Sequence, residues 1–512
     1  MRELVRILDG NTFAVSDTNG DIVASGSTPT GMFSYDTRFL STWVLTVNGE
    51  RLQTLSVDDL QYYETRFFLV PGAPTHYVDS TISVIRERTI TATLDEKLTV
   101  FNHDGAPARV TVRLEVDCDF ADLFEVKGGS VRPRDRRIQV EDGAMRFDYR
   151  REQLHRAVVI HSSVEPDIDD GGLCWVVDIG PQQGWSTDLR VSPEVLGGDG
   201  RDIRDSLRTG PGRSKAQLQL DLDEWLDRAP RLDSDWELLI STYRRSLIDL
   251  AALRFTPLAG PNRYMPAAGL PWFMSIFGRD SIFTSLQALP FTPELARTTI
   301  SVLAWGQGMA LDDFREEEPG KIMREFRYGE SAAFEEQPHS PYYGAADTPS
   351  LFLVLLDEYE LWTGDEGMVY AMEPEARAAL DWIDGYADLM GNGYVSYKRR
   401  NAGLGVENQC WKETPDAISY RDGRIPRAPR ATCELQGYAY DAKKRGARLA
   451  RQFWSDPELA ARLEYEAEDL KRRFNRDFWV EDGGYYALAL DADGGQVDAL
   501  SSNIGHLLWS GI

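Results

Sequence analysis

Hydrophobic and polar residues follow two different periods along the chain. Between residue 11 and about residue 225, β-branched and aromatic residues alternate with polar ones, and turn dipeptides such as Asn48-Gly49 separate the runs. The alternation is clearest over residues 81–100. Many short strands without a convincing helix predict an antiparallel β-sandwich over residues 1–225.

Beyond residue 230, hydrophobic residues recur every three to four positions, which predicts helices. Ser234 and Glu237 have the spacing of a capping box, and Thr292 followed by Pro293 marks the start of another helix. The stretch 348–362 is apolar on every side, so this helix is expected to lie inside the protein. Further helices are predicted over residues 281–289, 366–386, 432–453 and 456–474.

This order of elements predicts a multidomain β + α protein. Fully apolar helices that alternate with amphipathic ones indicate an inner and an outer ring, which is the plan of a helical toroid over residues 230–512. Residues 197–212, where Gly, Asp and Arg dominate, are expected to form a linker or a surface crossover. The loops 306–347 and 391–430 are longer than ordinary connections, and a site is expected there.

Composition narrows the choice of partners. The 512 residues include 82 acidic and 56 basic side chains, a formal net charge of -26, which disfavours nucleic acid and anionic membranes and favours a neutral substrate. Four scattered cysteines and six scattered histidines give no spacing typical of a metal site, and no phosphate-binding glycine loop occurs in the right context. The N-terminus lacks the apolar stretch of a signal peptide, so a cytoplasmic location is expected.

The segment 270–281 carries the clearest candidate chemistry. Trp272 and Phe273 can cover the apolar face of a pyranose, and the adjacent Arg279 and Asp280 can donate to and accept from vicinal hydroxyls. The position before an apolar helix predicts that Arg279 and Asp280 lie in a loop that faces a cleft. The alternative is a buried structural salt bridge beside core aromatics.

A second candidate lies in the long loop 391–430. Glycoside hydrolysis needs a protonated carboxylic acid, and a glutamate beside a tryptophan can have its pKa raised by desolvation. Glu413, two residues after Trp411, is therefore the first choice for the acid, and Asp416 is the second. The alternative is a solvated acidic loop. In the first long loop, Arg324 or Arg327 could contact sugar, or belong to an exposed salt-bridged loop.

Four ordered motifs give the chain a resemblance to a known family. Residues 269–280 resemble the GxPWFxxxxGRD signature of bacterial amylo-α-1,6-glucosidases, the glycogen-debranching type of six-hairpin (α/α)6 glycosidase. Residues 408–413 are similar to the NQxWKD segment of that family, 342–349 to its YYGxxDTP segment, and 502–509 to one of its helix starts. The β-rich half, including residues 35–40, resembles the sandwich that precedes the toroid in these proteins.

The resemblance implies a fold, a reaction and a set of roles. It implies an N-terminal antiparallel β-sandwich followed by an (α/α)6 toroid, and hydrolysis of α-1,6-linked glucose stubs on branched α-glucan with inversion, without cofactor or metal. Since only about eight of twelve helices are found, the toroid is expected to be incomplete. Proton donation is implied for Glu413, and contact with sugar for Trp272, Phe273, Arg279, Asp280, Asp347, Trp411 and Glu434.

The general base of the family has no counterpart in the sequence, so we expect the native chain to continue beyond Ile512. Three other functions stay open at this point: a disaccharide phosphorylase, another six-hairpin glycosidase such as a trehalase-like enzyme, and a non-catalytic glucan-binding protein. The sequence leaves the oligomeric state undetermined.

Overall fold

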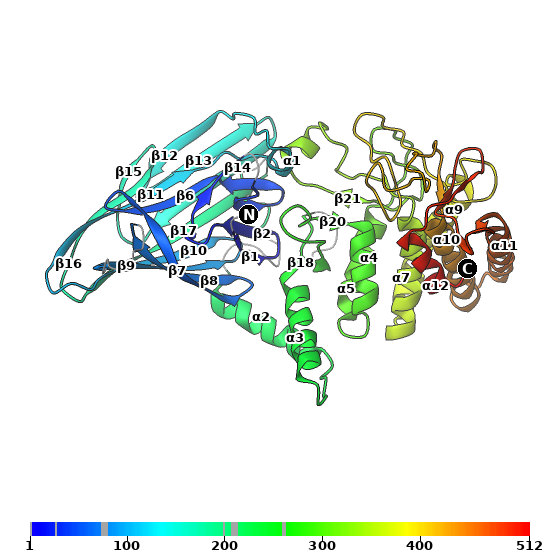
Figure 1. The fold of residues 1–512 in the computed structure, drawn as a ribbon, viewed down its shortest axis with the longest axis horizontal. Coiled ribbons are helices and arrows are strands. Elements are labelled where there is room, and N and C mark those ends of the chain that lie inside the picture. Colours follow the sequence, from blue (N-terminus) through cyan, green and yellow to red (C-terminus); the bar gives the residue numbers. More distant parts are fainter. Residues whose placement is uncertain (1–2, 26–27, 73–79, 198–199, 206–212, 259–262) are drawn as a thin grey trace. The chain divides into compact units, whose positions relative to one another are not determined.

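The computed structural model describes residues 3–512 except for 26–27, 73–79, 198–199, 206–212 and 259–262. The chain divides into two compact units (Figure 1). The first comprises Met1–Leu258, Gly269–Ser275 and Tyr328–Phe334, and the second comprises Ala259–Ala268, Ile276–Arg327 and Glu335–Ile512. The predicted linker at 197–212 lies largely outside the described residues.

Antiparallel sheets dominate the first unit, as the sequence predicts. The larger sheet has the order β12-β13-β14-β17-β10-β9-β8-β7-β6-β11-β16-β15, and β3 pairs with β6. Its strands are β3 (Ile22–Val23), β6 (Thr42–Val47), β7 (Glu50–Gln61), β8 (Glu64–Pro71), β9 (Ile82–Ile90), β10 (Leu94–Asn102), β11 (Ala108–Asp117), β12 (Arg136–Glu141), β13 (Ala144–Arg151), β14 (Leu154–Ser162), β15 (Asp167–Asp169), β16 (Gly172–Ile179) and β17 (Gly184–Leu196). The smaller sheet, β1-β2-β4-β5, contains β1 (Val5–Asp9), β2 (Thr12–Ser16), β4 (Gly31–Ser34) and β5 (Thr37–Leu40).

Burial alternates along β9 and β10 with the period of two seen in the sequence. The buried face is not wholly apolar, because Arg86 and Arg88 point inward from β9. Both pair with Glu96 of β10, at 2.9 Å from Arg86 Nε and 2.5 Å from Arg88 Nη2. Since each of these charged side chains is paired and hydrogen-bonded, the core of the sheet tolerates their burial. The opposite face of the same strands is accessible to solvent.

Three helices of the first unit precede residue 258: α1 (Leu123–Gly128), α2 (Lys215–Arg228) and α3 (Glu237–Ala252). The prediction of no helix before residue 225 is therefore wrong. A capping box starts each of the first two, with Asp122 as the cap of α1 and Ser214 as the cap of α2. The shortness of α1 hides its period, and α2 follows the glycine-rich stretch. The strand β18 (Arg254–Phe255) and the helix α6 (Glu330–Ala333) complete the unit.

The predicted capping box of α3 is absent from the structure. The helix follows Trp236 without a side-chain cap, and Ser234 Oγ instead accepts a hydrogen bond from the Trp236 amide at 3.1 Å. Of the apolar residues that recur at helical spacing here, Leu247 is buried, whereas Trp236 is 58% exposed and Leu239 is 38% exposed. The first half of α3 therefore extends into solvent within its unit.

Helices dominate the second unit. They are α4 (Gly278–Ala288), α5 (Pro293–Trp305), α7 (Thr348–Thr363), α8 (Glu366–Ala371), α9 (Glu373–Gly385), α10 (Cys433–Gln452), α11 (Pro457–Asp477), the 3₁₀ turn η1 (Ser502–Ile504) and α12 (Gly505–Ser510). Short strands lie between them: β19 (Met265–Pro266), β20 (Ile276–Phe277), β21 (Glu325–Phe326), β22 (Ala431–Thr432), β23 (Trp479–Val480), β24 (Tyr485–Tyr486), β25 (Ala489–Leu490) and β26 (Gln496–Val497). None of the described helices combines the length and apolar character needed to cross a bilayer.

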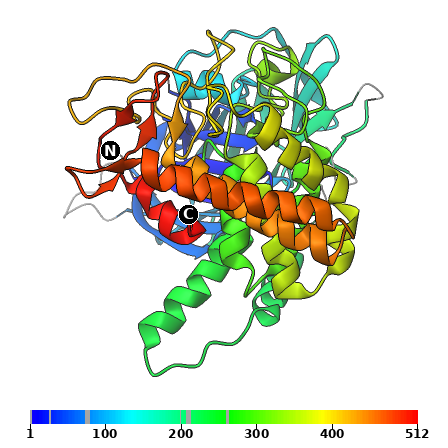
Figure 2. The ribbon, with the colours of Figure 1, turned by 90° about the vertical axis from the view of Figure 1, so that its right-hand side faces the viewer.

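The helices of the second unit pack around α7, which contacts α4, α5, α9 and α10. The helix α11 contacts α10, and these two lie side by side in orange in Figure 2. The residues Leu351 to Leu356 of α7 are each fully buried, which confirms that this apolar helix lies inside. The predicted helix 366–386 is two helices, because α8 ends before Pro374 in the first turn of α9. The incomplete (α/α)6 toroid stays a prediction.

Candidate active site

Arg279 and Asp280 lie in the first turn of α4, not in the loop that the sequence predicts. The preceding strand β20 pairs with β21, and the Gly278 amide donates to the Arg324 carbonyl oxygen at 2.8 Å. A Cβ on Gly278 would lie 2.4 Å from the Met323 carbonyl oxygen. Only glycine allows the two backbones to approach this closely, and their approach brings Arg324 beside Arg279.

The Arg279 guanidinium joins three segments of the second unit. Its Nη1 donates to Asp347 Oδ2 at 2.8 Å and to the Cys410 carbonyl oxygen at 2.7 Å. Its Nη2 donates to Glu413 Oε1, and its Cζ lies 5.7 Å from the centre of the Trp411 ring. The structure therefore brings together four residues that the sequence assigns to one site, although they lie up to 134 positions apart.

Glu413 lies between two guanidinium groups. Arg324 Nη2 donates to Oε2 at 2.5 Å, and Arg279 donates to Oε1. Burial alone would raise the pKa of Glu413, but the charges of Arg324 and Arg279 outweigh it and lower the pKa below its ordinary value. The expectation that the neighbouring tryptophan raises this pKa is therefore wrong. In this arrangement Glu413 is a carboxylate, and its role as proton donor stays a prediction.

Asp347 is the most deeply buried carboxylate of the group, with a side chain that is 0% exposed. It stands at the start of α7 and makes no cap to the helix. Its Oδ2 pairs with Arg279, whereas its Oδ1 is buried and has no hydrogen-bond partner among the described residues. A buried carboxylate oxygen in this state is ready to accept a hydrogen bond from a ligand hydroxyl or a water.

Asp280 is the accessible carboxyl of the site. Its side chain is exposed, although protein surrounds it on several sides. This crowding raises the pKa of Asp280; the positive charge of Arg279 opposes the rise, and the negative charge of Glu413 adds to it. An exposed carboxyl beside two guanidinium groups is suited to binding a sugar hydroxyl.

Aromatic rings lie beside the charged group. The Trp411 ring is 5.3 Å from the ring of Phe283 and 4.5 Å from that of His506, centre to centre. The hydroxyl of Tyr438 lies 2.9 Å from His506 Nδ1, and burial lowers the pKa of this histidine, so it is neutral at neutral pH. A hollow of about 410 Å³ borders Phe283, His506 and Trp509, but neither Trp411 nor the charged group lines it. Sequence reasoning missed Phe283, although it follows Arg279 by four positions on one face of α4.

Glu434 supports the Trp411 loop from inside. Its side chain is fully buried, and Oε1 accepts from Thr432 Oγ1 at 2.9 Å and from the Trp411 amide at 3.3 Å. Burial raises the pKa of this carboxyl. These bonds fix the position of Trp411, while direct contact of Glu434 with sugar stays a prediction.

The other predicted residues lie apart from this cluster or in the other unit. Asp416 is exposed in a turn of the Trp411 loop. Arg327 is buried, and its Nε donates to Glu325 at 3.1 Å. Trp272 and Phe273 belong to the segment that groups with the first unit, where the Lys127 ammonium lies 5.3 Å from the Phe273 ring centre. Their contact with sugar stays a prediction.

The arrangement as a whole has the chemistry of a polyol site. Arg279 and Arg324 offer donors, Asp280 and Asp347 offer acceptors, and Trp411 offers an aromatic face. Among the described residues no group of three or more His, Cys, Asp or Glu side chains could hold a metal ion.

Comparison with known proteins gives one sequence match. Residues 7–190 match the family model described as the N-terminal domain of some glycogen debranching enzymes. A search among curated proteins gives no match. The match covers strands of the first unit and supports a carbohydrate-active enzyme of glycosidase type.

Solved structures with distant similarity include three carbohydrate-active proteins. A GH78 family rhamnosidase of Bacillus sp. GL1 has 12% identity and a TM-score of 0.42, covering 81% of this chain and 36% of its own. A putative kojibiose phosphorylase from the human microbiome has 8% identity and a TM-score of 0.48, covering 94% and 69%. A rhamnosidase from Klebsiella oxytoca, solved with rhamnose bound, has 12% identity and a TM-score of 0.36, covering 73% and 69%. The chain thus spans about a third of the length of the Bacillus enzyme.

Proposed function

We propose that this protein is an inverting glycoside hydrolase that removes α-1,6-linked glucose stubs from glycogen-like glucans. The observation that carries the proposal is the junction at Arg279, where Glu413, Asp347 and Trp411 meet beside the exposed Asp280. The sequence match of residues 7–190 to a domain of glycogen debranching enzymes supports the choice of substrate.

In this proposal Glu413 protonates the leaving oxygen, while a second carboxylate, not identified among the described residues, takes the proton of the attacking water. Glu413 must first gain a proton. Sugar hydroxyls that accept hydrogen bonds from Arg279 and Arg324 would take the place of the Glu413 carboxylate. The hydrogen bonds from Arg324 and Arg279 contribute to the lowered pKa of Glu413, so their loss to substrate would raise that pKa. Glu413 would then carry its proton only when substrate occupies the site.

Asp280 and Asp347 are assigned to the hydroxyls of the terminal glucose. Asp280 is accessible, and the free Oδ1 of Asp347 can accept from a hydroxyl that reaches the buried end of the site. Trp411 is assigned to the apolar face of the ring, held there by Glu434.

The test measures glucose released from an α-1,6-branched limit dextrin, with proton NMR to identify the first anomer formed. We expect β-glucose first, and a loss of kcat of about 100-fold or more in Glu413→Gln with little change in KM. Asp280→Asn should raise KM more than it lowers kcat. Glu407→Gln is the matched control, because Glu407 lies in the same loop and pairs with Arg430 at 3.1 Å, away from Arg279.

Equal activity of wild type and Glu413→Gln would remove Glu413 from the mechanism. Release of sugar phosphate only when phosphate is added would replace hydrolysis by phosphorolysis. Preference for trehalose over the dextrin would make the protein another type of six-hairpin glycosidase. Binding of the dextrin without any product would leave a glucan-binding protein.

A further inference from the structure

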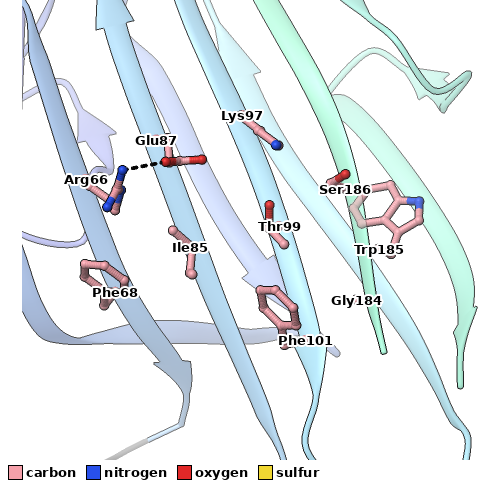
Figure 3. Close-up of a pocket in the computed structure, with 10 residues that line it drawn as sticks. All are labelled: Arg66, Phe68, Ile85, Glu87, Lys97, Thr99, Phe101, Gly184, Trp185 and Ser186. Carbon is pink, nitrogen blue, oxygen red and sulfur yellow. Dashed lines mark ion pairs between the residues drawn. The ribbon is translucent and has the colours of Figure 1, made fainter. Parts of the chain in front are cut away.

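A second hollow lies on the solvent face of the large sheet in the first unit (Figure 3). Its volume is about 490 Å³, and side chains of β8, β9, β10 and β17 line it. This volume falls within the range of about 300–1,000 Å³ typical of small-ligand sites. None of the residues that line it belongs to the candidate active site.

The strand register arranges the polar residues of this face in rows. Arg66 is opposite Glu87, Glu87 is opposite Lys97, and Lys97 is opposite Asp188, so one row crosses four strands with alternating charge. Arg66 Nη2 lies 2.9 Å from Glu87 Oε1. Asp188 does not line the hollow, so the row as it lines the hollow, Arg66, Glu87 and Lys97, carries a net charge of +1. The row offers donors and acceptors side by side.

The next rows supply hydroxyls and aromatic rings. Thr99 of β10 is opposite Ser186 of β17, and Phe68 of β8 is opposite Ile85 of β9. Phe101 of β10 is opposite Gly184 and is 36% exposed. Phe68 and Phe101 come from strands separated by β9 and from rows two residues apart along the strands, so their Cα atoms are about 12 Å apart.

Gly184 explains how Phe101 is held. A Cβ at this position would lie 2.9 Å from the Phe101 ring, so the ring lies against the β17 backbone where a side chain would otherwise stand. The ring therefore presents one face to solvent at low conformational cost. Trp185 lies at the β17 end of the hollow (Figure 3).

We propose that this sheet face is a second glucan-binding site, where Phe68 and Phe101 stack on pyranose rings and the Arg66-Glu87-Lys97 row binds their hydroxyls. Hydroxyls both donate and accept, so a row of alternating donors and acceptors beside aromatic rings fits a sugar. The inference depends on the proposed function only for the identity of the sugar, an α-glucan. Such a site would hold the protein on a polymer that exposes many branch ends, and would act through avidity.

The experiment is affinity electrophoresis of the full chain in native gels that contain glycogen, from which a dissociation constant follows. Phe101→Ala and Phe68→Ala should each weaken binding about tenfold, in proportion to the stacking they lose. Gly184→Ala should weaken binding in the same direction, because the added methyl group displaces the Phe101 ring. Phe291→Ala is the matched control, since Phe291 is also 36% exposed but lies in the second unit.

Thermal unfolding of each variant identifies any variant that fails to fold, and such a variant is replaced by Glu87→Gln, which retains the side-chain shape. Release of glucose from a short branched oligosaccharide should be unchanged in the sheet variants. Weaker glycogen binding by the sheet variants with unchanged glucose release supports the inference. Weaker glycogen binding supports it also if the protein releases no glucose at all, so the sheet site can be confirmed even where the hydrolase proposal fails. Unchanged retardation in both phenylalanine variants overturns it. A change in oligomeric state instead of glycogen binding also overturns it, since the face would then be an interface between copies.

Discussion

Arg279 and Arg324 both contact Glu413, but the loss of each should have a different effect on stability. Arg279→Met tests this difference. Methionine retains much of the apolar stem but removes the guanidinium. Without it, Asp347, which is 0% exposed, loses its ion pair, and its other oxygen has no partner among the described residues. Removing one partner of a buried ion pair costs about 3–5 kcal/mol, so we expect a loss of about 4 kcal/mol in the free energy of unfolding.

Arg324→Met is the matched comparison, because Arg324 also contacts two carboxylates. Glu413 is 29% exposed and keeps Arg279, and Glu325 keeps Arg327 at 3.1 Å and His339 at 2.6 Å. No buried carboxylate is left alone, so the expected loss is only about 1–2 kcal/mol. The difference between the variants therefore measures the isolation of Asp347 and not the loss of a guanidinium as such.

The assay is urea denaturation followed by circular dichroism in the helical band, because the second unit contains most of the helices. Adding Asp347→Asn to Arg279→Met should recover about 2 kcal/mol, since the uncompensated charge is then gone. If Arg279→Met costs no more than Arg324→Met, or if Asp347→Asn makes Arg279→Met still less stable, the reasoning from burial is refuted.

Three further predictions concern the same unit. Because the pKa of Glu413 is lowered, its contribution to stability is present above a carboxyl's ordinary pKa of 4.5 and is lost as the pH falls below that value. Glu413→Gln should therefore lose less stability than wild type between about pH 5 and pH 3. Parallel denaturation profiles of the two proteins would contradict this. The pKa of Glu434 is raised, so its contribution is lost as the pH rises; the cost of Glu434→Gln should shrink between about pH 5 and pH 8, and a growing cost would contradict burial as the cause. Gly278→Ala should lower the free energy of unfolding by about 2–3 kcal/mol, because its Cβ meets the Met323 carbonyl. Gly505→Ala is the control, since nothing lies within 4 Å of its Cβ, and it should be neutral or stabilising in thermal unfolding. Equal effects of the two substitutions would contradict the close-approach argument.

Local sequence signals located the long elements well. Thr292-Pro293 predicts the start of α5, although Thr292 makes no side-chain cap, and the apolar run in 348–362 predicts buried α7. The fixed φ of a proline at the helix start and the hydrophobic period both act within one element. The alternation over 81–100 likewise predicts β9 and β10. The period does not show which polar side chains are buried. Arg86 and Arg88 of β9 point inward, and their burial was not predictable because their partner Glu96 comes from another strand.

The site was predictable by residue type more than by environment. The sequence brings Arg279, Asp280 and Glu413 into one hypothesis, and the structure places Arg279 against Glu413. The direction of the pKa of Glu413 was not predictable from its neighbour Trp411, because Arg324 contacts the carboxylate from a position 89 residues away. Long-range charge pairs are determined by the tertiary fold, and single-sequence reasoning cannot rank them.

The guanidinium of Arg279 binds chain segments, around Asp347 and around Glu413, that leave the ribosome at well separated times. A nascent chain can pack α4 against α7 and form the bond to Asp347 well before Cys410 and Glu413 have been synthesised. The loop around Glu413 then has to close onto an arginine that is already held in position. The loop is fixed only after Glu434, which accepts from the Trp411 amide, has also been synthesised, and slow synthesis between residues 347 and 434 should prolong the lifetime of a half-assembled form.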